Sequence, residues 1–216
     1  MTKMKLSDET RTELEKMLTS ERIDRFLRIL EKRSDYITVI AENFFNPGNV
    51  SALVRTIDAV GFYDVNVIEY NNRYKHNQKI SRGTEKWVRT VRHKSLEGCF
   101  SDLRDAGYKI AYADPDPNNI DIFDVDVSSP LAILFGTEME GVSDNAKKNA
   151  DFGFRLPMKG FVESFNVSVS AALTLFTLRN KIEKEIGKNI FLSEEKKKEL
   201  FASWISVHGR GEVKYV

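Results

Sequence analysis

The sequence predicts an α/β fold in which helices flank a mostly parallel β-sheet. Short apolar runs alternate with longer amphipathic segments from residue 34 to residue 184, as in chains whose parallel strands are joined by helices. The chain has 216 residues, 41% of them hydrophobic, which suffices for one good-sized core but is short for two full domains. We therefore expect a helical extension (1–33), one α/β domain (34–184) and a second helical extension (185–216).

The predicted elements follow one another in a regular order. Strands are expected at 36–41, 64–69, 86–91, 109–113, 131–135 and 152–156. Helices are expected between them at 49–60, 95–106, 143–149 and 166–184. Before the first strand, one helix begins near Ser7 and another spans 21–32. A final helix at 193–207 carries an apolar side made of Leu200, Phe201, Trp204 and Ile205.

Composition limits the class of protein. No run of 18 apolar residues occurs and residues 1–17 lack a signal-peptide core, so we expect no membrane association and a cytoplasmic location. The single cysteine, Cys99, excludes an intrachain disulfide, and its amphipathic surroundings favour core packing over catalysis. Three scattered histidines form no zinc pattern. The acidic segment 114–126 is interpreted as a solvated loop with a short edge strand at Val125 and Val127, in preference to a metal site.

Two segments combine a strand end with polar side chains. After the first strand, a Pro-Gly turn precedes a helix expected to begin at Asn49, and Arg55 lies inside that otherwise apolar helix. A charge there needs a partner or a substrate. After the strand at 131–135, a loop bracketed by glycines contains Glu138.

A third segment, 156–170 (LPMKGFVESFNVSVS), is a polar loop that leads directly into an apolar helix. Ser164 or Asn166 is expected to cap this helix. The unpaired N–H groups of a helix N-terminus suit a polar or anionic ligand. An ordinary capped core helix is the alternative interpretation.

Residues 73–94 are the most basic stretch, with eight Lys or Arg against one acid. The basic residues are Arg73, Lys75, Lys79, Arg82, Lys86, Arg89, Arg92 and Lys94. Aromatic residues interleave with them, as in surfaces that neutralise phosphates and stack on bases. Either this strip binds RNA, or its charges pair with acids elsewhere in the chain.

In this order, the three segments resemble the SpoU-type family of RNA ribose 2′-O-methyltransferases, within the SPOUT (α/β-knot) superfamily. Its first motif is matched by Asn49 and Arg55, its second by 135–141, and its third by 156–167. The tRNA (guanosine-18) 2′-O-methyltransferase subgroup is the most similar, on Asn49-Val50-Ser51-Ala52, on Lys86-Trp87-Val88 and on the helical extensions.

The resemblance implies a SPOUT methyltransferase domain at 34–184 with a deep C-terminal trefoil knot. It also implies a homodimer whose active site is completed by both subunits, and the apolar side of the final helix is compatible with such an interface. The cofactor would be S-adenosyl-L-methionine, with no metal required. It would be bound by Ala113, Gly136, Gly141, Leu156, Met158 and Phe165.

The resemblance further implies catalytic roles for Arg55, Asn49, Glu138, Ser164 and Asn166. Arg55 would clamp a phosphate and stabilise the developing alkoxide. The two asparagines would orient substrate and loops, Ser164 would assist, and Glu138 would hold Asn49 or Arg55. For Glu138 and Ser164 a purely structural role in pinning the loops is the alternative. RNA contacts are assigned to Arg82, Lys86 and Arg89.

The expected function is therefore S-adenosylmethionine-dependent 2′-O-methylation of guanosine 18 in the D-loop of tRNA. Methylation of ribosomal RNA or of another tRNA position is one alternative. A catalytically silent RNA-binding module of the same fold is the other, although such a module would have no need of the full set of polar motif residues.

Overall fold

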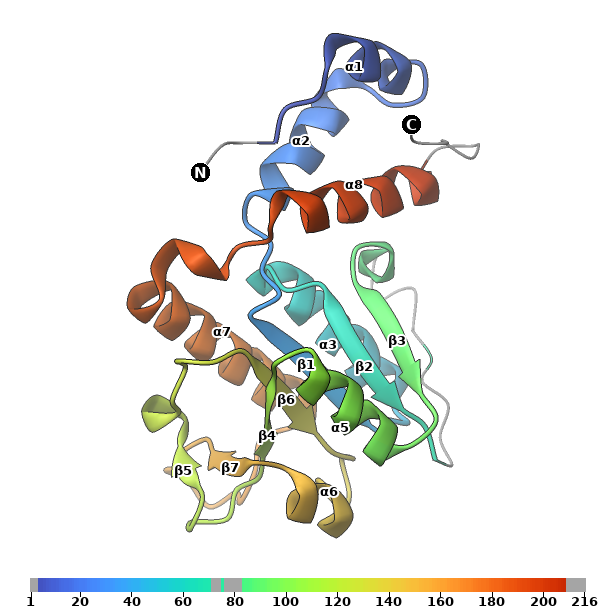
Figure 1. The fold of residues 1–216 in the computed structure, drawn as a ribbon. Helices are drawn as coiled ribbons and strands as arrows, with labels where there is room; N and C mark the ends of the chain where they lie inside the picture. The colour runs from blue at the N-terminus through green and yellow to red at the C-terminus, as the bar shows by residue number, and fades with distance from the viewer. Residues whose placement is uncertain (1–3, 71–74, 76–82, 209–216) are drawn as a thin grey trace. The chain divides into compact units, whose positions relative to one another are not determined.

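The computed structural model describes residues 4–70, 75 and 83–208 (Figure 1). It divides into two compact units. One contains Asp35–Ile190, and the other combines the two ends of the chain, Met1–Ser34 and Phe191–Val216.

The larger unit contains a sheet whose described strands all pair in parallel. The strands are β1 (Ile37–Glu42), β2 (Asp64–Ile68), β3 (Arg89–His93), β4 (Lys109–Ala113), β5 (Ile120–Asp121), β6 (Leu131–Phe135) and β7 (Phe152–Arg155). Their order across the sheet is β3-β2-β1-β6-β4-β7-β5. In the centre, Val39 of β1 lies opposite Val65 of β2 and Ile133 of β6. The predicted mostly parallel sheet is confirmed.

Helices cover both faces of this sheet (Figure 1). They are α3 (Pro47–Val60), α5 (Leu96–Asp105), α6 (Asp144–Asn149) and α7 (Val167–Glu185), with 3₁₀ turns η1 (Thr84–Lys86), η2 (Ile122–Asp124) and η3 (Gly187–Ile190). The pair α5 and α6 lies on one face, and α3 packs against α7 on the other. Every residue of β1 and β6 is buried, which explains their continuous apolar sequences.

The core beneath α5 contains the single cysteine. Cys99 is fully buried in a cluster with Ile40, Ile110 and Leu134 from the sheet and Phe100 from its own helix. Burial raises the pKa of the Cys99 thiol to about 12, because the thiolate would lose its hydration there. Core packing is thus the role that the structure gives it.

Three sequence expectations about elements are corrected. Strand β3 begins at Arg89 and not at residue 86, because Lys86 is the last residue of a 3₁₀ turn, Thr84–Lys86. Helix α3 begins at Pro47, because the side chain of Asn46 caps it by accepting a hydrogen bond from the Gly48 N–H at 2.8 Å. No strand covers 125–127 within the described residues, and the edge strand is β5 instead.

The smaller unit consists of the helices α1 (Asp8–Glu15), α2 (Ser20–Leu30) and α8 (Glu194–His208). The ring of Phe26 on α2 packs against Phe201 and Trp204 of α8, with centroid distances of 6.5 and 5.7 Å. The apolar side of α8 is therefore buried within this unit. The expectation that it is available for a dimer interface is wrong.

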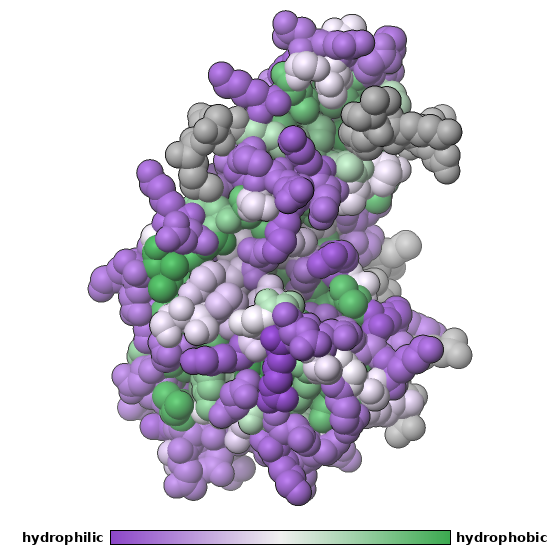
Figure 2. All heavy atoms as spheres, viewed as in Figure 1, coloured by the Kyte–Doolittle hydropathy of each residue, from purple (hydrophilic) through white to green (hydrophobic). Residues whose placement is uncertain are grey.

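The surface visible in Figure 2 is mostly hydrophilic, with hydrophobic residues in small separate spots. In the described part of the chain, no helix combines the length and the hydropathy needed to cross a bilayer.

Candidate active site

A cavity of about 420 Å³ opens at the carboxyl ends of β4, β6 and β7. Its lining comes from 113–115 after β4, from 135–141 after β6, and from the segment that connects β7 to α7. Open parallel sheets bind ligands at this edge, because the loops that follow neighbouring strands meet there. The second and third motif segments are thereby brought to one place.

A tight loop after β6 forms one side of the cavity. Thr137 and Gly141 pair through two backbone hydrogen bonds of 2.9 and 3.1 Å. Gly141 has a left-handed backbone with a φ of 72°. A side chain at Gly136 would meet the carbonyl oxygen of Gly141 at 2.0 Å, so only glycine fits there. The two glycines allow the loop to close.

Three polar motif residues form a chain at the cavity edge. The Asn49 Nδ2 donates to Glu138 Oε1 at 2.7 Å, and the Asn166 Nδ2 donates to Asn49 Oδ1 at 3.3 Å. The Asn166 Oδ1 caps α7 by accepting from the Ser168 N–H at 2.9 Å. The second oxygen of Glu138, Oε2, is buried and has no hydrogen-bond partner among the described residues. A buried carboxylate oxygen in this state suits a ligand that donates a hydrogen bond.

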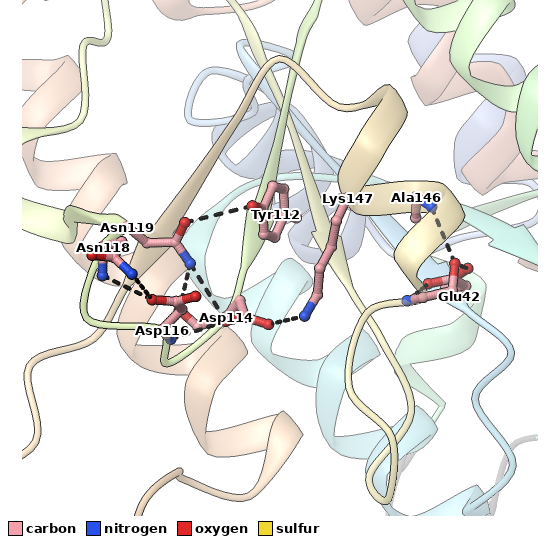
Figure 3. A network of polar contacts seen from close by, with 9 residues as sticks. Glu42, Tyr112, Asp114, Asp116, Asn118, Asn119, Ala146 and Lys147 are labelled. Carbon is pink, nitrogen blue, oxygen red and sulfur yellow. Dashed lines mark hydrogen bonds and ion pairs between the residues drawn. The ribbon is translucent and has the colours of Figure 1, made fainter.

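A polar network fixes the loop after β4 (Figure 3). Asp114 Oδ1 accepts from the Asp116 N–H at 2.9 Å, and Asn119 Nδ2 donates to the Asp114 carbonyl at 3.2 Å. Lys147 of α6 forms an ion pair with the Asp114 carboxylate at 2.5 Å. A side chain at Gly153 would meet Asn119 Oδ1 at 2.3 Å, so this glycine leaves room for the network.

Comparison with known proteins now decides the family. The model of the SpoU rRNA Methylase family matches residues 36–176. The chain belongs to the SpoU methylase family. Its fold resembles the crystal structure of the A. aeolicus TrmH/SpoU tRNA modifying enzyme, with a TM-score of 0.79, 29% identity, and coverage of 90% of this chain and 97% of the other.

Two relatives of this SpoU chain carry the same name, tRNA (guanosine(18)-2′-O)-methyltransferase. The protein from Borreliella burgdorferi is 31% identical over 187 residues, which cover 87% of this chain and 85% of the relative. The protein from Thermus thermophilus is 33% identical over 188 residues, which cover 87% of this chain and 97% of the relative.

The structure gathers most of the site residues expected for a SpoU methylase. All six proposed cofactor contacts line the cavity: Ala113, Gly136, Gly141, Leu156, Met158 and Phe165. Glu138, Ser164 and Asn166 line it as well, and Asn49 reaches it through its hydrogen bond to Glu138. Arg55 is exposed on α3 and is not part of the described lining.

The basic residues that were predicted to contact RNA have different surroundings in the structure. Lys86 is exposed at the end of η1, whereas Arg82 lies outside the described residues. Arg89 makes two hydrogen bonds to the Asp64 carboxylate at 2.8 and 2.5 Å, which raise the pKa of Arg89. Part of the basic strip is thus paired within the chain.

Sequence reasoning missed Asp114, which lines the cavity, and its ion-pair partner Lys147. The aspartates at 114 and 116 gave one usable signal, because each accepts from a backbone N–H two residues on, as in Asx turns. The sequence around Lys147 contains no such signal, because its partner Asp114 is far away along the chain. Over the described ranges, no three His, Cys, Asp or Glu side chains gather as a metal site would require.

Proposed function

We propose that this protein transfers the methyl group of S-adenosylmethionine to the ribose 2′-hydroxyl of guanosine 18 in tRNA. One observation carries the proposal: the second and third motif segments line the same cavity, and Asn49 of the first motif donates a hydrogen bond to Glu138 in its wall. The names of the two relatives supply the nucleotide and the substrate class.

The cavity fits the cofactor that the family uses. Its volume of about 420 Å³ lies in the usual range for small-molecule sites, roughly 300–1,000 Å³. Leu156, Met158 and Phe165 give it apolar wall, and Glu138 Oε2 offers a buried acceptor for a donor group. We assign cofactor binding to these three residues together with Ala113, Gly136 and Gly141. When bound, S-adenosylmethionine supplies an electrophilic methyl group.

The chain's own side chains must position a hydroxyl and help it to lose its proton. Positioning alone supplies a large part of the rate of such transfers. Asn49 and Asn166 present amides beside the cavity, and the hydrogen bond from Asn49 to Glu138 fixes the first of them. Ser164 lines the same wall and assists the two asparagines in positioning the substrate hydroxyl. A guanidinium does not serve as a base in proteins, so Arg55 clamps a substrate phosphate and stabilises negative charge, while the hydroxyl proton passes to phosphate or water.

The position of Arg55 favours a homodimer with shared sites. Arg55 follows Asn49 by six residues, which places it about 9 Å along α3 and about 120° around it. It therefore lies away from the cavity edge that Asn49 reaches. In the dimer that we propose, Arg55 of one subunit acts at the cavity of its partner.

An exposed apolar stripe on α7 supports this dimer. Val169, Leu173 and Phe176 recur at helical spacing and are 44, 42 and 65% exposed. They lie on the helix that begins at the cavity. Contiguous exposed apolar side chains mark interaction surfaces. Light scattering of the wild type and of Phe176→Glu tests it, with a dimer expected for the first and a monomer for the second.

Arg55→Ala should leave folding and cofactor binding intact and cut methyl transfer by about a hundredfold or more, as for loss of a preorganised electrostatic group. Arg55→Lys should restore little, because lysine lacks the planar two-point fork. Turnover close to wild type in either variant would make Arg55 structural.

A mixed dimer tests the shared site directly. Arg55→Ala and Asn166→Ala chains are each expected to be inactive alone. When the two are co-expressed, one site of each mixed dimer combines an intact Asn166 with an intact Arg55 from the other chain. Activity should therefore return. If it does not, Arg55 acts within its own chain.

The substrate is tested with labelled S-adenosylmethionine, unmodified tRNA transcripts and ribosomal RNA. Label should appear at guanosine 18 and disappear from a transcript with adenosine at that position. Label elsewhere in tRNA, or in ribosomal RNA, would reassign the substrate. RNA binding without transfer would favour the silent module.

We infer three further properties from family membership. Lys86 and Arg89, with Arg82, contact the RNA backbone, although Asp64 competes for Arg89. The segment after β7 and the loop at 136–141 belong to the trefoil knot of the family, which is checked by tracing the chain path in a crystal structure. The protein works in the cytoplasm, where tRNA is available, and cell fractionation checks this location.

A further inference from the structure

An ion pair joins a loop that lines the cavity to helix α6. Asp114 belongs to the loop after β4 and lines the cavity. Lys147 belongs to α6, which follows the glycine loop 136–141 in the sequence, and that loop also lines the cavity. The Lys147 Nζ lies 2.5 Å from Asp114 Oδ2. The pair therefore connects the loop after β4 to the helix that follows the glycine loop.

The loop after β4 is rigid around Asp114. The Asp114 N–H donates to the carbonyl of Phe154 at 3.0 Å, and the Asp114 carbonyl accepts from Asn119 at 3.2 Å. One carboxylate oxygen accepts from the Asp116 N–H, which leaves the other for Lys147. All four polar groups of Asp114 are thus used within the chain, so the lysine meets a fixed acceptor.

Helix α6 is fixed at its start. Ser143 caps it, donates its hydroxyl to Glu42 Oε1 at 2.5 Å and donates its N–H to Glu42 Oε2 at 3.0 Å. Figure 3 shows Glu42 beside Ala146 in the first turn of this helix. Glu42 ends β1 and is buried. Lys147 follows Ser143 by one helical turn. The lysine therefore connects a helix anchored to the sheet with the neighbouring loop after β4.

From this geometry we propose that Lys147 is a positioning residue that holds the loop after β4 at its working distance from the loop 136–141 in the wall of the cofactor cavity. The inference rests on the proposed function, because it assigns the cavity to S-adenosylmethionine. The side chains of Lys147 and Asp114 are 33 and 13% exposed, so the pair is partly shielded from solvent screening. The hydrogen bond to Asp114 raises the pKa of Lys147, which keeps it charged at neutral pH.

The test compares Lys147→Met, Lys147→Arg and Lys148→Met with the wild type. Methionine keeps much of the aliphatic stem and removes the charge. Lys148 is exposed on the same helix, so its replacement is a matched control for net charge. Calorimetry with S-adenosylmethionine and S-adenosylhomocysteine gives Kd, and steady-state kinetics gives KM for the cofactor and kcat.

For Lys147→Met, we expect Kd and KM for the cofactor to rise about fivefold, the factor that corresponds to ~1 kcal/mol, with kcat at saturating cofactor unchanged. Lys147→Arg should recover most of the affinity and Lys148→Met should match the wild type. A general loss of stability would not separate KM from kcat in this way.

Unchanged cofactor affinity in Lys147→Met would overturn the inference, as would an equal effect in Lys148→Met. If Lys147→Met unfolds at the assay temperature, Asp114→Asn supplies the same comparison, because it keeps the acceptor for Asp116 and removes the charge. Failure of the wild type to bind either ligand would overturn the proposed function itself, which is a different result.

Discussion

The two sides of the cavity differ in how the chain holds them. The built side consists of the loops 113–119 and 136–141, which are fixed by backbone pairing, Asx turns and the ion pair of Asp114. The open side is the segment 159–166, in which every residue is exposed. Phe161 there is fully exposed to solvent. One cavity therefore combines a preorganised wall with a wall that protrudes into solvent.

This difference suits two ligands of different size. A preorganised wall lowers the entropic cost of binding a small cofactor. An exposed segment with apolar side chains gains contacts when a macromolecule covers it. We therefore expect changes on the built side to affect the cofactor and a change at Phe161 on the open side to affect RNA, whereas Phe165 near the end of that segment is a proposed cofactor contact.

The largest effect is expected from Gly136→Ala on the built side. Its methyl group would meet the backbone of Gly141 and Val142, so the loop must move. We expect a loss of roughly 1–3 kcal/mol in stability and weakened cofactor binding, measured by denaturation and calorimetry. Gly160→Ala on the open side is the control, because nothing lies within 4 Å of the added carbon. Equal behaviour of the two variants would contradict the comparison.

A smaller effect is expected from Phe161→Ala on the open side. Stacking of an aromatic side chain on a base contributes about 1 kcal/mol at the low end of its range, so the KM for tRNA should rise about fivefold. The Kd for S-adenosylmethionine should stay the same. A variant with weakened cofactor binding and normal tRNA binding would reverse the assignment of this side.

Two basic residues test how far the RNA surface extends beyond the cavity. Replacing exposed Lys86 by Ala should lower the salt slope of tRNA binding by about one unit, as for one lost phosphate contact. Arg89→Ala should lower it less, because Asp64 already neutralises part of that charge. Equal slopes for both variants and the wild type would leave the strip without a role in RNA binding.

The smallest effect is expected from replacing His93, which does not line either side of the cavity and should alter only the pH dependence of stability. Its ring lies 2.9 Å from Asn66 Oδ1 and 3.4 Å from Asp102. Burial lowers the pKa of His93 although Asp102 opposes the shift. As the pH falls below about 6.5, the histidine is protonated more readily in the unfolded chain than in the folded protein. The free energy of unfolding therefore decreases as the pH is lowered through and below this value.

His93→Gln should therefore reduce the difference in unfolding free energy between pH 7.5 and pH 5, as measured by urea denaturation. The glutamine keeps a hydrogen-bond donor near Asn66 and removes the titration. The same pH dependence in both proteins would place the titrating group elsewhere.

Sequence patterns predicted the buried strands well, because a continuous apolar run such as 131–135 has few other uses. They failed at Val125 and Val127, which are both buried without forming a strand. The alternation of valines with polar residues at 125–127 therefore indicates buried side chains but not a hydrogen-bonded strand. The apolar side of α8 was recognised for the same reason, but periodicity could not say that α2 of the same chain covers it.

The candidate site was predicted unevenly. The resemblance supplied the motif residues, and the structure brings nearly all of them to one cavity. Arg55 could not be placed, since a position on a helix does not reveal which cavity it serves. The Lys147 ion pair was also beyond sequence reasoning, because one lysine on a short charged helix looks like any other.

The reactivity of Cys99 toward a thiol reagent measures how often the packing between α5 and the sheet opens. Cys99 is the single thiol of the chain and is fully buried on the side of α5 that packs against the sheet. A thiol reagent can reach it only after that helix detaches or the domain unfolds. The labelling rate, followed with and without cofactor and tRNA, would report which ligand slows this opening, without any engineered probe.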